Sequence, residues 1–74
     1  MMNKRTKTEE RLYAALDAWE YCHRLPPTIR ELIEAAGYKS RGSSQPALHG
    51  LRNAGLITWE EGKARTLRVV KNAG

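Results

Sequence analysis

The 74-residue sequence has one cysteine, Cys22, and no phenylalanine. A single cysteine cannot form an internal disulfide, and such sparse cysteine usage fits a reducing cytoplasm. A chain of this length forms one small domain with a thin hydrophobic core. Leucine, isoleucine, alanine and two tryptophans must supply that core, because phenylalanine is absent. The five aromatic residues are therefore expected inside the domain, and we predict a cytoplasmic protein.

Long apolar runs are also missing, and none approaches the roughly 20 residues of a membrane span. The basic N-terminus lacks the apolar stretch of a signal peptide, so no membrane contact is expected. Cys22 and His23 are adjacent rather than at metal-ligand spacing, and a zinc site would lack thiol partners. A cysteine–histidine nucleophile pair is equally poorly supported. We therefore expect no metal, no cofactor and no enzyme activity.

Acidic residues are absent from positions 35–59, and this gap divides the chain by charge. Residues 1–38 hold six basic and six acidic side chains, which cancel. Residues 39–74 hold seven basic and two acidic side chains, so the whole net charge of +5 lies there. A solvated basic surface is one interpretation. A long acid-free stretch is more typical of a surface that faces a polyanion.

The first predicted helix covers residues 6–24. Thr6 and Glu9 can form a capping box at its start, and the helix must end before Pro26. Leu25 is expected to enter the core as the chain turns. Apolar residues at one-turn spacing predict a buried stripe with Tyr13 and Cys22 at its edges: Leu12, Ala15, Leu16 and Trp19.

Two shorter helices are predicted over residues 28–36 and 43–54. Thr28 and Glu31 can form a second capping box, and Gly37 suits the left-handed end of that helix. Ser43 or Ser44 can cap the third helix. Pro46 is tolerated in its first turn, and Gly55 closes it. The inner faces are expected to hold Ile29, Leu32, Ile33 and Ala36, and then Ala47, Leu48, Leu51 and Ala54.

Residues 56–70 predict a hairpin, because two alternating segments flank a polar loop that contains Gly62. The expected fold class is mainly α (α+β). It is a three-helix winged helix-turn-helix with a C-terminal two-stranded β-hairpin wing, in a single domain over residues 1–74. Residues 1–5 are expected to form a flexible basic arm, and residues 71–74 a frayed tail.

This order of elements resembles the N-terminal winged helix-turn-helix of LexA-type SOS repressors, without a gap over residues 6–70. The resemblance implies that the helix 43–54 enters the major groove and that the hairpin rests on the backbone or minor groove. The matching residues are Pro26-Pro27-Thr28, Glu31-Leu32, Gly37-Tyr38, Ser40, Leu48, Leu51, Gly55-Leu56-Ile57 and Gly62.

The same resemblance implies a set of positions that face DNA bases: Ser40, Gly42, Ser43, Gln45 and Pro46. The family typically has asparagine at position 42 and acidic residues at 45 and 46, so a LexA operator is not implied. The family's C-terminal peptidase and dimerisation domain is absent from this sequence. A small stand-alone regulator, phage or plasmid borne, is as consistent with the sequence as a fragment of a bacterial host repressor.

Gln45 is the strongest base-reading candidate, because its amide can pair bidentately with adenine. Arg41 can reach guanine or phosphate, and His49 is either a further base contact or an ordinary surface histidine. Phosphate contacts are predicted from a wider set: Thr28, Lys39, Ser44, Arg52, Lys63 and Arg65. Capping alone explains at least one of the serines.

The predicted function is a sequence-specific double-stranded DNA-binding transcriptional regulator, a repressor by its resemblance. It is expected to be a monomer that pairs as a homodimer on a palindromic operator, nucleoid-associated when bound. The alternative is a winged-helix protein-interaction module, such as an antirepressor or polymerase-associated factor, and a generic nucleoid or RNA binder is a third. The acid-free stretch favours the first, because a docking face would more often show exposed apolar residues.

Overall fold

The computed structural model describes residues 6–39, 42 and 44–70. Three helices, α1 (Lys7–Cys22), α2 (Ile29–Ala35) and α3 (Ser44–Asn53), precede two strands, β1 (Ile57–Thr58) and β2 (Arg68–Val69). The strands pair antiparallel, with Ile57 opposite Val69. The predicted winged helix-turn-helix is therefore confirmed. The proposed arm at residues 1–5 and tail at residues 71–74 lie outside the described residues.

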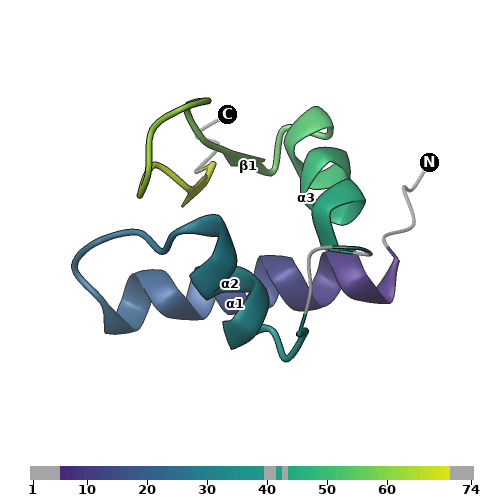
Figure 1. Cartoon of the computed structure of the whole chain (residues 1–74), viewed down its shortest axis with the longest axis horizontal. Helices are drawn as coiled ribbons and strands as arrows, with labels where there is room; N and C mark the ends of the chain where they lie inside the picture. Colours follow the sequence, from purple (N-terminus) through teal and green to yellow (C-terminus); the bar gives the residue numbers. More distant parts are fainter. Residues whose placement is uncertain (1–5, 40–41, 43, 71–74) are drawn as a thin grey trace.

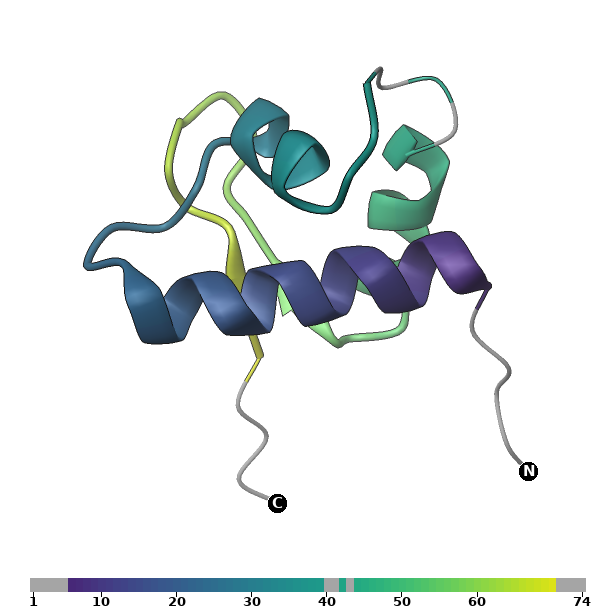
Figure 2. The same ribbon diagram turned by 90° about the horizontal axis from the view of Figure 1, so that it is seen from below.

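The long helix α1 is the base on which the other elements rest (Figures 1 and 2). It contacts α2, α3 and β2. Near the C-terminal end of α1, the Glu20 carboxylate accepts a hydrogen bond from the backbone N–H of Val69 at 2.9 Å. At the other end, α3 passes so close to α1 that a Cβ on Gly50 would collide with the Glu9 carboxylate. Glycine at this position allows the close crossing.

Both predicted capping boxes are present. The Thr6 hydroxyl accepts a hydrogen bond from Glu9 N–H, and the Glu9 carboxylate accepts one from Thr6 N–H, both at 3.1 Å. Thr28 and Glu31 make the same reciprocal pair at 3.0 Å. Each box satisfies N–H groups that have no partner within the helix. The helices therefore begin one residue after their threonine caps.

The ends of α2 and α3 share one hydrogen-bond pattern. Gly37, with φ of 94°, donates to Glu34 O, while Tyr38 N–H donates to Ile33 O. Gly55 and Leu56 repeat this arrangement after α3. A left-handed glycine followed by a bond back to the preceding turn ends both helices, as the sequence predicts at both glycines.

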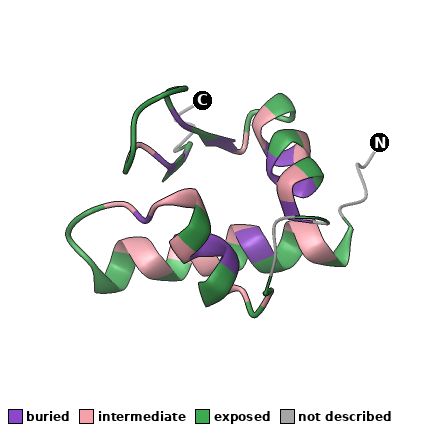
Figure 3. Cartoon of the chain, viewed as in Figure 1, coloured by how far each residue is buried: buried purple, intermediate pink, exposed green. Residues whose placement is uncertain are grey.

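The core draws on every helix and strand, and the buried surfaces of these elements face one another (Figure 3). In the wing, Leu67 and Val69 are buried while Arg68 between them is exposed, which is the alternation expected of a half-buried strand. Trp59 lies in this core, as predicted. The buried apolar side chains are Leu12, Leu16, Leu32, Ile33, Ala47, Leu48, Leu51, Ile57, Trp59, Leu67 and Val69.

The expectations for the end of α1 are wrong in several places. Leu25 is 63% exposed rather than buried, Tyr21 is 84% exposed, and Cys22 is exposed rather than at the edge of a buried stripe. The Trp19 indole N–H donates to Leu25 O at 2.8 Å, and its half-buried ring stacks on His23. The tryptophan thus binds the Leu25 backbone, while the leucine side chain stays in solvent.

The connection from α1 to α2 also departs from the predicted boundary at residue 24. α1 ends at Cys22, because His23 already has extended backbone angles. At the end of α3, Ala54 is exposed rather than on the inner face, since it follows the last helical residue, Asn53. None of the helices in the described residues is long and apolar enough to cross a bilayer.

Candidate nucleic-acid interface

α3 presents one apolar and one polar side. Leu48 and Leu51 are fully buried, and this anchors the helix against α1. On the polar side, Pro46 and His49 are exposed, and Gln45 and Arg52 are half-buried. Gln45, His49 and Arg52 share a helix face, because they are four and three residues apart. The described part of α3 carries no carboxylate on this face.

The predicted base-reading residues are only partly within the described chain. Gly42 is exposed, as are Pro46 and His49, and Gln45 is half-buried. Ser40, Arg41 and Ser43 lie outside the described residues. The base-reading role of this group stays a prediction.

Ser44 differs from its neighbours because it is completely buried. Its Oγ has no hydrogen-bond partner among the described residues. Since α3 begins at this residue, its backbone N–H is one of those that a helix start leaves without an internal partner. The side chain that was predicted to contact phosphate therefore does not reach the surface in the free chain.

Arg52 joins α3 to the wing through Trp59 and Glu61. Arg52 Nη1 lies 2.7 Å from Glu61 Oε2, and Nη2 donates to Trp59 O at 3.0 Å. The guanidinium also lies over the indole ring, 4.3 Å from its centroid. The Trp59 Nε1–H donates to the same carboxylate oxygen at 3.1 Å. His49 packs edge-on against the ring.

These bonds change the acidity of Glu61. The hydrogen bond from Arg52 holds the pKa of the Glu61 carboxyl below its ordinary value, and the bond from the Trp59 indole adds to this. Both donors favour the ionised form. Glu61 is therefore negatively charged at neutral pH and pairs with a guanidinium that is always positive.

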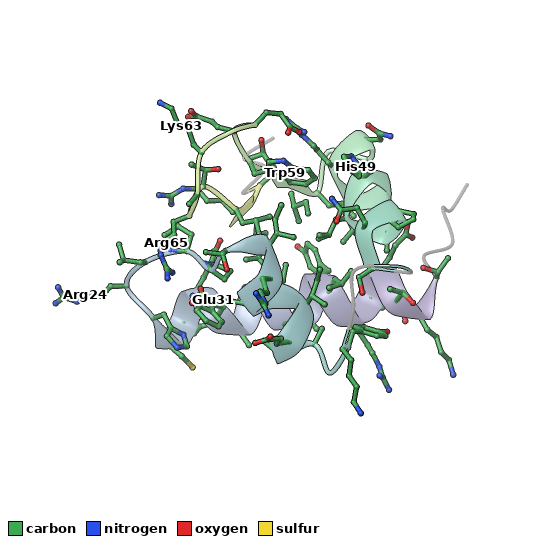
Figure 4. The ribbon with its side chains drawn as sticks, viewed as in Figure 1. Arg24, Glu31, His49, Trp59, Lys63 and Arg65 are labelled. Atoms are coloured by element: carbon green, nitrogen blue, oxygen red, sulfur yellow. The ribbon has the colours of Figure 1, made fainter. Side chains whose placement is uncertain are left out.

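Arg65 makes the second connection, from the wing to the start of α2. Its Nη1 donates to Glu31 Oε1 and to Pro26 O, both at 3.0 Å, and its Nη2 donates to Glu31 Oε2 at 3.1 Å. This is a bidentate arginine–carboxylate pair. Figure 4 shows the Arg65 side chain directed toward Glu31 from the wing. The pair links residues 34 positions apart.

Glu31 also takes part in the cap of α2, and the hydrogen bond of that cap has the largest effect on the pKa of its carboxyl. The backbone hydrogen bond from Thr28 lowers the pKa of the Glu31 carboxyl, and the Arg65 hydrogen bonds lower it further. Arg65 itself has φ of 59°, a left-handed conformation that few residues other than glycine adopt. Its three side-chain hydrogen bonds hold the residue in this unusual backbone position.

Thr66 holds the tip of the wing through a backbone hydrogen bond. The Lys63 ammonium at this tip has only a weak, exposed partner. The Thr66 hydroxyl accepts a hydrogen bond from Glu60 N–H at 2.8 Å. Lys63 Nζ lies 3.7 Å from Glu60 Oε1, with both side chains mostly in solvent. Figure 4 shows Lys63 pointing away from the body of the domain. Such an exposed pair contributes little to stability, so the ammonium group is available to another anion.

The remaining predicted phosphate contacts are at α2 and just after it. The Thr28 hydroxyl serves as the cap of α2 and is half-buried, whereas Lys39 is exposed. Local sequence patterns do not indicate Glu61 and Glu31 as the partners of Arg52 and Arg65. No helix or strand spacing signals either pair, since the partners lie nine and 34 residues apart on different elements. Within the described residues, no three histidine, cysteine or acidic side chains are grouped as metal ligands.

Comparison with known proteins places the chain in a family. The family model for the LexA DNA binding domain matches residues 2–66. A LexA repressor of Acetivibrio thermocellus is 32% identical over 72 residues, which are 97% of this chain and 34% of that protein. A transcription regulator LexA of Synechocystis sp. is 43% identical over 44 residues, 60% of this chain and 22% of that protein.

A third relative, a LexA repressor of Desulfatibacillum aliphaticivorans, is 41% identical over 49 residues. That match covers 66% of this chain and 24% of the relative. The chain thus spans about a third or less of the length of these relatives. The matched residues include all three helices and the wing as far as Thr66. The chain belongs to the LexA DNA-binding domain family.

Proposed function

We propose that this chain is a sequence-specific DNA-binding transcriptional regulator that acts as a repressor. The observation that carries the proposal is the acid-free polar face of α3 beside a wing that exposes Lys63, in a chain of the LexA DNA-binding domain family. The relatives it matches are named as repressors or regulators. The protein would act by binding alone, without metal, cofactor or enzyme chemistry, on nucleoid DNA in the cytoplasm.

In this proposal α3 enters the major groove, and its start reads base edges. Gln45 supplies the most specific contact, because an amide can accept from adenine N6 and donate to N7 at once. The other proposed base contacts are Ser40, Arg41, Gly42, Ser43, Pro46 and His49. Thr28, Lys39 and Lys63 are proposed to hold the phosphates on either side, which sets the register of α3 on the duplex.

Assembly on DNA is proposed to require two copies. Among the described residues, Tyr21, Leu25 and Val70 are the large apolar side chains that remain exposed. Stable dimers bury larger apolar surfaces, so a free monomer is expected. On a palindromic operator, two α3 helices would lie in major grooves about 34–36 Å apart. Inserting about five base pairs between half-sites, half a helical turn, should abolish the gain from the second half-site.

The decisive experiment is to select bound duplexes from a random library and then titrate the selected duplex against salt. Each phosphate that a basic side chain neutralises contributes about −0.9 to the slope of log affinity against log salt, so affinity should fall steeply as salt rises. Random duplex should bind more weakly than the selected site. Affinity that does not change between low and physiological salt would contradict the proposal.

A second candidate function, protein docking, is favoured by the exposure of Tyr21 and Leu25 around the end of α1. Tyr21 lies on α1 and Leu25 lies in the connection that follows it, so neither is on α3. Replacing the two residues together with serine distinguishes the candidates. A DNA regulator should keep its operator affinity, whereas a docking module would lose its partner and show no selected DNA site.

A further inference from the structure

We propose that Arg52 and Arg65 are positioning residues that hold the wing at a fixed angle to α3 and α2, rather than ligands of DNA phosphate. The proposal rests on the proposed DNA-binding function for its effect on affinity. It assigns to Glu61 and Glu31, two acidic residues on a basic protein, a supporting role in binding a polyanion. Lys63 remains the phosphate contact of the wing.

The contacts of Arg52 leave little of its guanidinium for DNA. Nη1 and Nη2 bind the Glu61 carboxylate and Trp59 O, and one face of the group is covered by the indole ring. Its side chain is 32% exposed, against 70% for Lys63. A phosphate that approached the bound edge of the guanidinium would compete with the short charge-assisted hydrogen bond to Glu61 and with Trp59 O. Lys63 has only a distant, solvent-exposed partner to give up.

Arg65 is engaged in the same way on the other side of the wing. It spans from the hairpin to both Pro26 O and the Glu31 carboxylate, and these bonds hold its backbone in the left-handed region. Figure 4 shows that Arg65 and Trp59 approach the body of the domain at separate places, toward α2 and α3 respectively. Two connections to different elements restrict rotation of the wing more than one would.

The wing needs such connections because its own pairing is minimal. β1 and β2 have two residues each, and an isolated two-stranded hairpin is at best marginally stable in water. The buried side chains Leu67 and Val69 and the bond from Val69 N–H to Glu20 attach β2 to the core. The two arginines instead hold the loop side of the hairpin, where Lys63 is located.

The direction in which Glu61→Ala changes the affinity for DNA separates a positioning role of Arg52 from a phosphate contact. Removing a carboxylate makes the protein more positive, which by itself raises affinity for DNA. If Glu61 merely restrains a phosphate-binding Arg52, Glu61→Ala should bind DNA more tightly and with a steeper salt slope. If Arg52 positions the wing, Glu61→Ala should bind more weakly despite the added charge, because the wing must then be ordered during binding.

The chain offers a matched control for each connection. Glu60→Ala removes the same charge one residue away and disturbs only the exposed pair with Lys63. Glu31→Gln breaks the bidentate pair but keeps the capping box, since glutamine also completes that box. Glu34→Gln is its control on the same helix, because the Glu34 carboxylate pairs with the exposed Arg30 side chain at 3.6 Å rather than with the wing. Random-sequence duplex and the selected duplex are the probes.

We expect Glu61→Ala and Glu31→Gln to bind both duplexes about three- to tenfold more weakly, the loss that ordering a few groups causes. Their salt slopes should equal that of the unmodified chain, and the two controls should bind as tightly or slightly more tightly. Tighter binding by Glu61→Ala, or equal affinities of Glu61→Ala and Glu60→Ala, would overturn the proposal.

Two further measurements keep the proposal testable if Glu61→Ala folds poorly. Arg52→Lys and Arg65→Lys retain the charge but lose the planar fork, so they should weaken binding without changing the slope. Arg68→Lys, at an exposed position of β2 that has no proposed DNA contact, should bind normally. Arg→Lys variants with full affinity would show that only charge matters, which overturns the proposal.

The free protein provides a readout that does not depend on DNA. The indole N–H signal of Trp59 should shift in Glu61→Ala and stay in place in Glu60→Ala, because the bond to Glu61 Oε2 is lost only in the first. If the unmodified chain binds no duplex, the proposed function fails, and this signal still tests the connection. If it binds but the variants do not follow the expected order, only the positioning role fails.

Discussion

α3 and the wing lie side by side in this domain and both contribute side chains to its core, but the loop side of the wing is held by directional bonds. α3 is anchored by fully buried leucines and by a close crossing with α1 at Gly50. The wing has two-residue strands and is joined to the helices by directional bonds from Arg52 and Arg65. Burial sets how stable the domain is, while the exposed bonds of the wing set where its tip lies. Substitutions in the two regions should therefore change different properties.

The largest expected effect is on folding, at the buried side of α3. Leu48 is fully buried in the core, so Leu48→Ala should lower the free energy of unfolding by about 2–5 kcal/mol. That is a large part of the stability of a small domain. Urea denaturation measures the loss. Glu61→Ala, in the wing, should leave the unfolding midpoint nearly unchanged, and equal losses in both variants would contradict the contrast drawn between the regions.

The next effect is on specificity, at the exposed side of α3. Gln45→Ala should cost about 1–3 kcal/mol on the selected site and little on random duplex, because the amide is proposed to read a base. Binding isotherms on both duplexes provide the test. An unchanged ratio of selected to random affinity would remove Gln45 from the base-reading set.

Lys63→Ala, the counterpart of Gln45→Ala in the wing, should change the affinity for DNA without changing specificity. Lys63→Ala should weaken selected and random binding alike and reduce the magnitude of the salt slope by about 0.9, one phosphate contact. Titration of both duplexes at several salt concentrations measures this. If the slope is unaffected, Lys63 does not neutralise a phosphate.

The smallest effect concerns pH and is confined to the wing connections. The pKa values of Glu31 and Glu61 are lowered in the folded chain from the ordinary value of 4.5. The folded state therefore binds fewer protons, and its stabilisation is complete above about pH 4.5. It is lost as the pH falls through the lowered pKa values. Because both groups are exposed, the change should be modest.

Comparing denaturation midpoints between pH 7 and pH 3 tests this dependence. A variant with both Glu31→Gln and Glu61→Ala should lose less stability on acidification than the unmodified chain. Parallel pH profiles for the two proteins would show that other carboxylates dominate the acid response.

Much of the fold was predictable because its signals are local. The Thr6 and Thr28 boxes depend on residues three positions apart, and Gly37 and Gly55 end helices through bonds to the turn just before them. The buried stripe failed only at the last turn of α1. There the spacing predicts that Cys22 lies at the edge of the core, and the turn after the helix predicts that Leu25 enters it, but both side chains are exposed.

The candidate site was predictable to a smaller extent. Residue types and the family resemblance single out Gln45 and Lys63, and their roles stay predictions. Charge alone predicts phosphate contacts for Arg52 and Arg65. Their carboxylate partners leave no signal in the sequence, because a charged side chain on a helix or hairpin can face solvent, DNA or another element.

The sequence by itself determined the starts of α1 and α2, the ends of α2 and α3, the alternation of the wing and the concentration of positive charge after Tyr38. Each of these follows from contacts within a few residues or from composition. The tertiary structure decided which positive charges are free. Only when α2, α3 and the hairpin pack together does Glu31 meet Arg65 and Glu61 meet Arg52 over Trp59. Such pairing depends on the crossing of elements rather than on spacing along the chain, and no local pattern encodes it.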